Sequence, residues 1–326
     1  MRDAFPETSP GLLARPLISL SRKRRDRVIV RVEAWVPMRH LRAYRRTAER
    51  GERHVHIEHD DQAGEPGAVE HRAGRWDTLI ARNPTVRRFE VSSPRIDPAH
   101  DGITIAHLTD LHVKGEWSTR RIKRAVSVMN EVEPDLVLLT GDYVRYSREA
   151  FSHLPTVLRA FDAPVFATLG NHDHWLDAEG VTAALHLGQV DVLSNESRTV
   201  ELNGHPLHVI GIDDRHTGHD DAERAFAGVP ATGTRIVLSH IAEVADEIGH
   251  HGGALVLSGH THRGQVNVPG ITKRIFANMG HRYFGGFYRT GGQVLYVSSG
   301  IGQSVPIRFG APTEVAVFVL RSSARR

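Results

Sequence analysis

Short apolar runs recur along the chain from residue 84 onward, and each is bounded by turn-forming or polar residues. Between two of them, Thr119–Glu131 has helical spacing, with Ile122, Val126 and Met129 on one face, and Pro134 ends that helix. Strand-like runs alternating with helical stretches predict a layered α/β fold flanked by helices. The strands would form a β-sandwich of two sheets, or else one large sheet. The runs are Ile103–Leu108, Leu136–Thr140, Val165–Leu169, Leu207–Ile212, Arg235–Leu238, Ala254–Leu257, Val294–Val297 and Glu314–Leu320.

The pattern in front of residue 84 is weaker. Val28–Val36 alternates like a short strand, Leu41–Arg53 has the spacing of a basic helix, and residues 60–74 are rich in glycine and acids, as in a linker. The chain therefore divides into a basic N-terminal segment of less defined fold, residues 1–83, and one domain, residues 84–326.

Charge separates the same two regions. The chain of 326 residues carries a net charge of +3, but residues 1–96 carry +7 and the remainder −4. We interpret the basic front first as a solvated face and second as a contact with an anionic membrane surface. Nucleic acid is disfavoured as a partner, because aromatic residues are too sparse among the basic ones to form a binding platform.

No apolar stretch reaches the roughly 18 residues of a transmembrane helix. Leu12–Leu20 is interrupted by Arg15 and Pro16, and the basic run Arg22–Arg25 follows it, the reverse of a signal peptide. We expect a cytoplasmic protein, with peripheral contact at the inner face of the membrane as the alternative. The chain has no cysteine, which excludes disulfides, thiolate metal ligands and a cysteine nucleophile.

Polar side chains follow five of the apolar runs, at the point where each run ends. Because ligands bind at the carboxyl ends of strands in open α/β sheets, we expect these side chains to meet. They are Asp110 and His112; Asp142; Asn171, His172 and Asp173; His240; and His260 and His262.

These residue types suit a site for two hard-to-borderline divalent metal ions. Carboxylates and neutral imidazoles are available and thiolates are absent. One carboxylate has to bridge the two ions, and Asp142, central in the order, is the natural choice. Gly141, Gly170 and Gly259 each precede such a residue and are expected to let the backbone turn sharply.

The ordered motifs Asp-x-His, Gly-Asp, Gly-Asn-His-Asp, His and Gly-His-x-His resemble the signature of the calcineurin-like metallophosphoesterase superfamily, over residues 84–321. The stretches Asp135–Tyr143, Gly211–Asp214 and Tyr296–Gly302 are similar to small bacterial phosphodiesterases grouped with UDP-2,3-diacylglucosamine hydrolases. Arg263 departs from the glycine usual in that group.

The resemblance implies two half-sites and a reaction. One ion, manganese, iron or zinc, would be held by Asp110, His112 and His262, and the other by Asn171, His240 and His260, with Asp142 bridging. Metal-bound hydroxide would attack a phosphodiester or pyrophosphate. His172 would donate a proton to the leaving oxygen or stabilise its charge, and Asp173 would orient His172.

The favoured substrate is a lipid nucleotide like UDP-2,3-diacylglucosamine. Alternatives are a general phosphodiesterase or nuclease, and a non-catalytic metal-binding interaction protein or peripheral membrane protein. His174 and Trp175 follow the Gly-Asn-His-Asp motif and are candidates for substrate contact. His107 lies inside a predicted strand and is interpreted as a core histidine.

Overall fold

A computed structural model describes residues 18–19, 84–303 and 307–323. The strand predicted at Val28–Val36 and the helix predicted at Leu41–Arg53 lie outside these residues, and the division at residue 84 stays a prediction. No helix within the described ranges combines the length and the apolar character needed to cross a bilayer.

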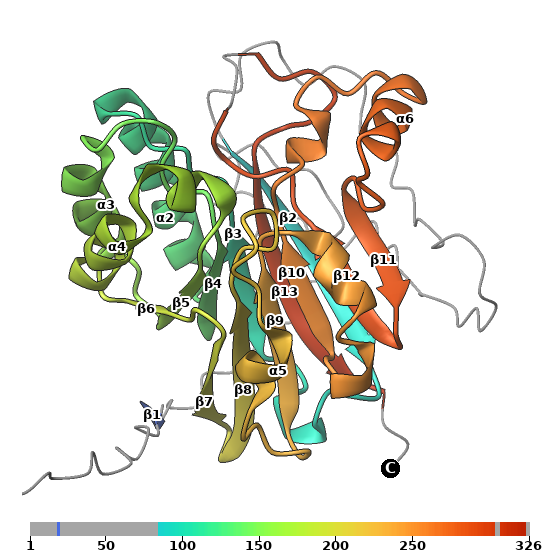
Figure 1. Ribbon diagram of the computed structural model, residues 1–326. Coiled ribbons are helices and arrows are strands. Elements are labelled where there is room, and N and C mark those ends of the chain that lie inside the picture. Colours follow the sequence, from blue (N-terminus) through green and yellow to red (C-terminus); the bar gives the residue numbers. More distant parts are fainter. Residues whose placement is uncertain (1–17, 20–83, 304–306, 324–326) are drawn as a thin grey trace, which may run out of the picture.

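Two mixed sheets form the body of the protein (Figure 1). One has the strand order β2-β13-β3-β4-β5-β6 and the other β1-β7-β8-β9-β10-β12-β11. The first contains β2 (Thr85–Ser93), β3 (Thr104–Leu108), β4 (Leu136–Thr140), β5 (Val165–Thr168), β6 (Val190–Val192) and β13 (Glu314–Ser322). The second contains β1 (Ile18–Ser19), β7 (Glu196–Leu202), β8 (His205–Ile212), β9 (Thr234–Ser239), β10 (Leu255–Ser258), β11 (Gly286–Thr290) and β12 (Gln293–Val297).

Three apolar cores separate the layers. The core between the sheets contains Phe89, Leu138, Leu238 and Phe318, which are all buried. A second core lies between the first sheet and three helices, α2 (Glu116–Val132), α3 (Ala150–Leu158) and α4 (Asn171–Leu187), which Figure 1 shows together on one side. A third core packs the other sheet against α5 (Ala222–Phe226) and the short helix η3 (Ala242–Asp246), and the short helix η4 (Gly249–His251) follows it along the chain. The predicted layered α/β fold is confirmed.

All eight predicted strands are present, with ends that shift by at most two residues. The helix predicted at Thr119–Glu131 is α2, which begins three residues earlier. The strands that the pattern did not single out include β2, β7 and β11. β2 and β11 are edge strands and β7 is paired at one end with a two-residue strand, so each of them has several positions that are not fully buried.

Parallel pairing aligns the strand ends that matter for the site. β3, β4 and β5 run parallel in one sheet, and β8, β9, β10 and β12 run parallel in the other. Their carboxyl ends therefore reach the same edge of the sandwich. The helix η5 (His262–Gly264) follows β10 at this edge and leads to α6 (Ile271–Asn278), the outlying helix of Figure 1.

Candidate metal centre

The loops that leave five strands bring all seven predicted ligands to one edge. Six of them are buried, and His260 is partly exposed. The residues are Asp110 and His112 after β3, Asp142 after β4, Asn171 after β5, His240 after β9, and His260 and His262 after β10.

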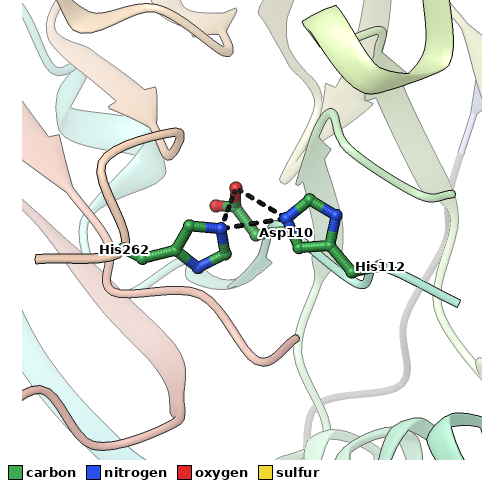
Figure 2. Close-up of side chains that lie close together, drawn as sticks. All are labelled: Asp110, His112 and His262. Carbon is green, nitrogen blue, oxygen red and sulfur yellow. Dashed lines mark hydrogen bonds and ion pairs between the residues drawn. The ribbon is translucent and has the colours of Figure 1, made fainter. Parts of the chain in front are cut away.

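Asp110, His112 and His262 form the first cluster (Figure 2). The Nε2 atoms of the two imidazoles lie 2.9 Å apart. Asp110 Oδ1 is 3.4 Å from His262 Nε2 and 3.9 Å from His112 Nε2. Three potential ligand atoms thus converge on one point in the protein interior.

Asp142 lies between this cluster and a second one. Its Oδ2 atom is 3.7 Å from His112 Nε2 and 3.4 Å from His240 Nε2. Its other oxygen, Oδ1, accepts a hydrogen bond of 2.9 Å from the backbone N–H of His172. One carboxylate oxygen is therefore shared between two groups of imidazoles.

Asn171 and His260 lie on the His240 side. His260 Nδ1 is 2.9 Å from Asn171 Oδ1, and the His260 ring lies 5.2 Å from the ring of His240. The structure thus places all seven residues in the two predicted groups, while their roles as ligands stay a prediction.

The donor atoms of these groups fit a bound cation. His240 Nδ1 is 2.7 Å from the carbonyl oxygen of Thr140, which can only accept, so Nδ1 carries a hydrogen, and Nε2, which must lose its proton when a cation binds, faces Asp142. Both His240 Nε2 and Asp110 Oδ1 are buried without a hydrogen-bond partner. Ligands at about 2.1 Å from a first-row ion lie about 3.0–3.4 Å apart, close to the spacing found here.

The electrostatic environment of His240 also favours a positive charge. Burial lowers the pKa of His240, but the carboxylates of Asp142 and Asp110 outweigh it and raise that pKa to about 10. Burial lowers the pKa of His112 to about 3 and holds that of His262 well below its usual range. His112 and His262 are therefore neutral near pH 7, the form that binds metal.

The backbone at the site is in an unusual conformation. Five of the predicted ligands have positive φ, between 45° and 69°, which non-glycine residues seldom adopt. Hydrogen bonds between the loops hold this conformation, including Asp110 N–H to Gly141 O and His112 N–H to Asp142 O, both 3.0 Å. Such strain is typical of functional sites. The five are Asp110, His112, Asp142, His260 and His262.

The glycines have a second role besides turning the chain. Gly141 has a φ of +79°, as expected, but neither Gly170 nor Gly259 has a left-handed backbone. A Cβ atom on Gly170 would lie 2.5 Å from Asp142 Oδ1, and one on Gly259 would lie 2.4 Å from Asp110 Oδ2. These two positions need glycine because the carboxylates, and at Gly259 also the side chain of Thr109, pass so close.

His172 is directed toward the clusters. Its Nε2 atom is 4.0 Å from Asp142 Oδ2, and its ring contacts the ring of His112 at 4.9 Å. The rings of Tyr146 and Trp175, both largely exposed, pack edge-on against it at 5.2 and 4.9 Å. His172 thus lies at the mouth of the site, between two aromatic side chains.

Asp173 has a different environment from the one predicted. Its carboxylate accepts hydrogen bonds of 2.8–3.2 Å from the backbone N–H groups of Asp142, Tyr143, Val144 and Gly170. Within the described part of the chain it has no hydrogen bond to the ring of His172. Asp173 therefore holds the loop that carries Asp142 against the start of α4.

Two of the other histidines can be compared with their predictions. His174 Nε2 lies 2.7 Å from Asp213 and its ring stacks on His219, so it is held within the protein, whereas the neighbouring Trp175 is exposed. His107 is buried and hydrogen-bonded to Thr140 Oγ1 at 2.8 Å, which confirms its interpretation as a core histidine.

Comparisons with known proteins show the family of this chain. Residues 103–264 match the family model described as calcineurin-like phosphoesterase. The uncharacterized metallophosphoesterase YkuE of Bacillus subtilis is 31% identical over 241 residues, which are 72% of this chain and 84% of that protein. The phosphodiesterase YaeI of Escherichia coli is 30% identical over 224 residues, which are 66% of this chain and 81% of that protein. A Danio rerio transmembrane protein with a metallophosphoesterase domain is 29% identical, and this chain covers 59% of its length.

Proposed function

This chain belongs to the calcineurin-like metallophosphoesterases, which are metal-dependent phosphoester hydrolases, and we propose that it hydrolyses a phosphodiester or pyrophosphate with two divalent cations. Asp110, His112 and His262 would hold one cation, and Asn171, His240 and His260 the other, with Asp142 shared. Manganese, iron or zinc suits these nitrogen and oxygen donors.

The position of Asp142 is the observation that carries this proposal. Its Oδ2 atom has an imidazole nitrogen of each group within 3.7 Å, and burial leaves no solvent to separate these atoms. A single cation at either group would leave the unpartnered atom of the other group, Asp110 Oδ1 or His240 Nε2, buried and unsatisfied, which is costly. Two cations on opposite sides of one carboxylate oxygen would satisfy both sets.

The protein's own residues would supply position and a hydrogen-bond donor. When bound, the cations would neutralise phosphoryl oxygens and lower the pKa of an attacking water. His172, outside both ligand groups, would donate from Nε2 to the leaving oxygen. The backbone N–H of His172 donates a hydrogen bond to Asp142 Oδ1, which holds His172 close to the carboxylate that would be shared by the two cations. Asp173, through its four amide contacts, would keep Asp142 in place.

We propose a lipid nucleotide, such as UDP-2,3-diacylglucosamine, as the substrate. The rings of Trp175 and Tyr146 are exposed and flank His172, so they could stack on a flat group of the substrate next to the leaving oxygen. The similarity to YaeI, which is named a phosphodiesterase, fits a diester. A nuclease is disfavoured because residues 97–326 carry a net charge of −4. Membrane contact through the basic segment 1–83 stays part of this proposal.

A substrate panel tests the reaction and the substrate class separately. The full chain with added manganese is assayed on bis(4-nitrophenyl) phosphate, on UDP-2,3-diacylglucosamine and on a single-stranded oligonucleotide. We expect turnover of the first two substrates, with the higher kcat/KM on the lipid nucleotide. Turnover of the oligonucleotide alone would overturn the substrate class, and turnover of none of the three would overturn the proposed reaction.

A further inference from the structure

One side of α6 exposes large apolar side chains to solvent. Ile271, Ile275 and Met279 are 59%, 51% and 66% exposed. They are four residues apart, so they lie within about 80° of one another around the helix axis. A soluble helix normally turns such a stripe toward the protein, and here it faces outward.

The apolar area extends beyond the helix. Val266, Val268 and Phe309 are 39–42% exposed. Val266 pairs with Phe309 in an isolated bridge, and the N–H of Val268 binds the hydroxyl of Thr272 on α6. We call Ile271, Ile275, Met279, Val266, Val268 and Phe309 the α6 surface. Exposed apolar side chains that gather in one part of a fold mark interaction sites.

The chain segment that carries the α6 surface has charged side chains of one sign. Residues 248–313 contain no aspartate or glutamate but six lysines and arginines. Two of these, Lys273 and Arg274, are exposed on α6 itself. Among the described residues, neither has an ion-pair partner, whereas Arg282 is paired with Asp246 at 2.6 Å. The surface is therefore apolar with unneutralised positive charge beside it.

The α6 surface is close to the metal centre. Phe276 on α6 contacts the ring of His281 at 5.6 Å, and that ring contacts His260 at 5.2 Å. At its other end α6 follows η5, which carries His262, and Thr272 Oγ1 donates to Val266 O between them. A partner bound to α6 would thus be separated from His260, a predicted metal ligand, by Phe276 and the single imidazole ring of His281.

We propose that the α6 surface docks on an anionic lipid bilayer, with its apolar side chains at the headgroup boundary. The combination of an apolar stripe with flanking Lys273 and Arg274 fits such a bilayer better than a protein groove, since lysine and arginine are attracted to anionic headgroups. Docking in this way would turn the metal centre toward phosphoesters at the membrane surface. Binding to the bilayer does not depend on the reaction proposed above.

Co-sedimentation with vesicles tests this proposal on the full chain without substrate. Vesicles of phosphatidylglycerol and phosphatidylcholine are compared with phosphatidylcholine alone, at 0.1 and 0.5 M salt. The apolar variant is Ile271→Ser/Ile275→Ser/Met279→Ser and the charge variant is Lys273→Gln/Arg274→Gln. Leu187→Ser is the control, because Leu187 is 62% exposed at the end of α4.

We expect the apolar variant to lower the partition coefficient on anionic vesicles at least about tenfold. The charge variant should lower it severalfold at 0.1 M salt and little at 0.5 M, because salt screens these charges. Leu187→Ser should bind like the wild type. All variants should keep wild-type turnover on soluble bis(4-nitrophenyl) phosphate, so a failure of binding is distinguished from a failure of catalysis.

Equal binding of the wild type and the apolar variant would overturn the proposal. The same holds if binding survives in the apolar variant but disappears when Arg22, Lys23, Arg24 and Arg25 are changed to glutamine, because the N-terminal segment would then be the contact. Self-association of the wild type that the apolar variant lacks, without vesicle binding, would assign the surface to a second copy of the chain instead.

Discussion

Replacing Asp142 with asparagine removes one negative charge and almost no volume. The amide oxygen can keep the hydrogen bond from the backbone N–H of His172, which Asp142 Oδ1 now accepts at 2.9 Å. The new NH2 group would point at His112 and His240, whose Nε2 atoms lie 3.7 and 3.4 Å from Oδ2. Because these lone pairs would receive hydrogen bonds, we expect the Asp142→Asn protein to fold and to lose cation binding.

The size of the effect can be worked from His240. Burial alone lowers its pKa, yet Asp142, with help from Asp110, raises it from 6.5 to about 10. This corresponds to a preference of about 5 kcal/mol for positive charge at that point. If roughly half of it is lost, the half-site that contains His240 binds its cation on the order of 100-fold more weakly, since 1.4 kcal/mol is a factor of ten.

Metal analysis after dialysis and turnover during manganese titration measure this loss. Turnover of Asp142→Asn should fall at least about 100-fold at the manganese concentration that just saturates the wild type. Asp135→Asn is the matched control, because Asp135 begins the same segment and accepts a 2.8 Å hydrogen bond from Thr104 N–H at the other end of β4. Wild-type metal content and turnover in Asp142→Asn would refute the bridging role.

Three further predictions concern the neighbouring residues. His172→Ala should lower turnover about 100-fold with unchanged metal content, and loss of metal in this variant would make His172 structural. Asp173→Ala leaves four backbone N–H groups without their acceptor and should lower the free energy of unfolding, measured in urea, by roughly 3 kcal/mol. Unchanged stability together with a shifted pH–rate profile would instead mean that Asp173 orients the ring of His172. Because the pKa of His240 is raised to about 10, its proton is bound at pH 7.5 and must leave when a cation binds, so calorimetry in buffers of different ionisation enthalpy should detect release of about one proton per chain. Zero release would contradict His240 as a ligand that is protonated before the cation binds.

The sequence pattern predicted the strands and the residues that meet at their ends. Leu136–Thr140 and its neighbours are buried on both faces, so they read as continuous apolar runs, and parallel pairing leaves little freedom for the loops at their carboxyl ends. The convergence of Asp110, Asp142 and His240 is therefore a consequence of topology. The pattern of apolar runs did not predict polar-rich strands such as β7, because about half of the positions in such a strand are only partly buried.

Other features depend on tertiary contacts that no local pattern encodes. Three of the four contacts of Asp173 are backbone N–H groups from a loop about 30 residues away, and amide partners leave no mark on side-chain identity. The positive φ of Asp142 is imposed by hydrogen bonds from the β3 loop. Arg263, which departs from the glycine expected from the resemblance, has a φ of 51°, a left-handed conformation that glycine adopts more readily. The exposure of the apolar side of α6 could not be predicted, because the four-residue spacing of its apolar side chains is the same as in a helix that buries them.

The most direct test of the two-cation phosphoesterase is to strip the full chain with a chelator and restore manganese in measured equivalents. Hydrolysis of bis(4-nitrophenyl) phosphate is followed at each step. The stripped protein should be inactive, and activity should rise until two equivalents per chain are bound. Full activity in excess chelator, or a plateau at one equivalent, would contradict the account.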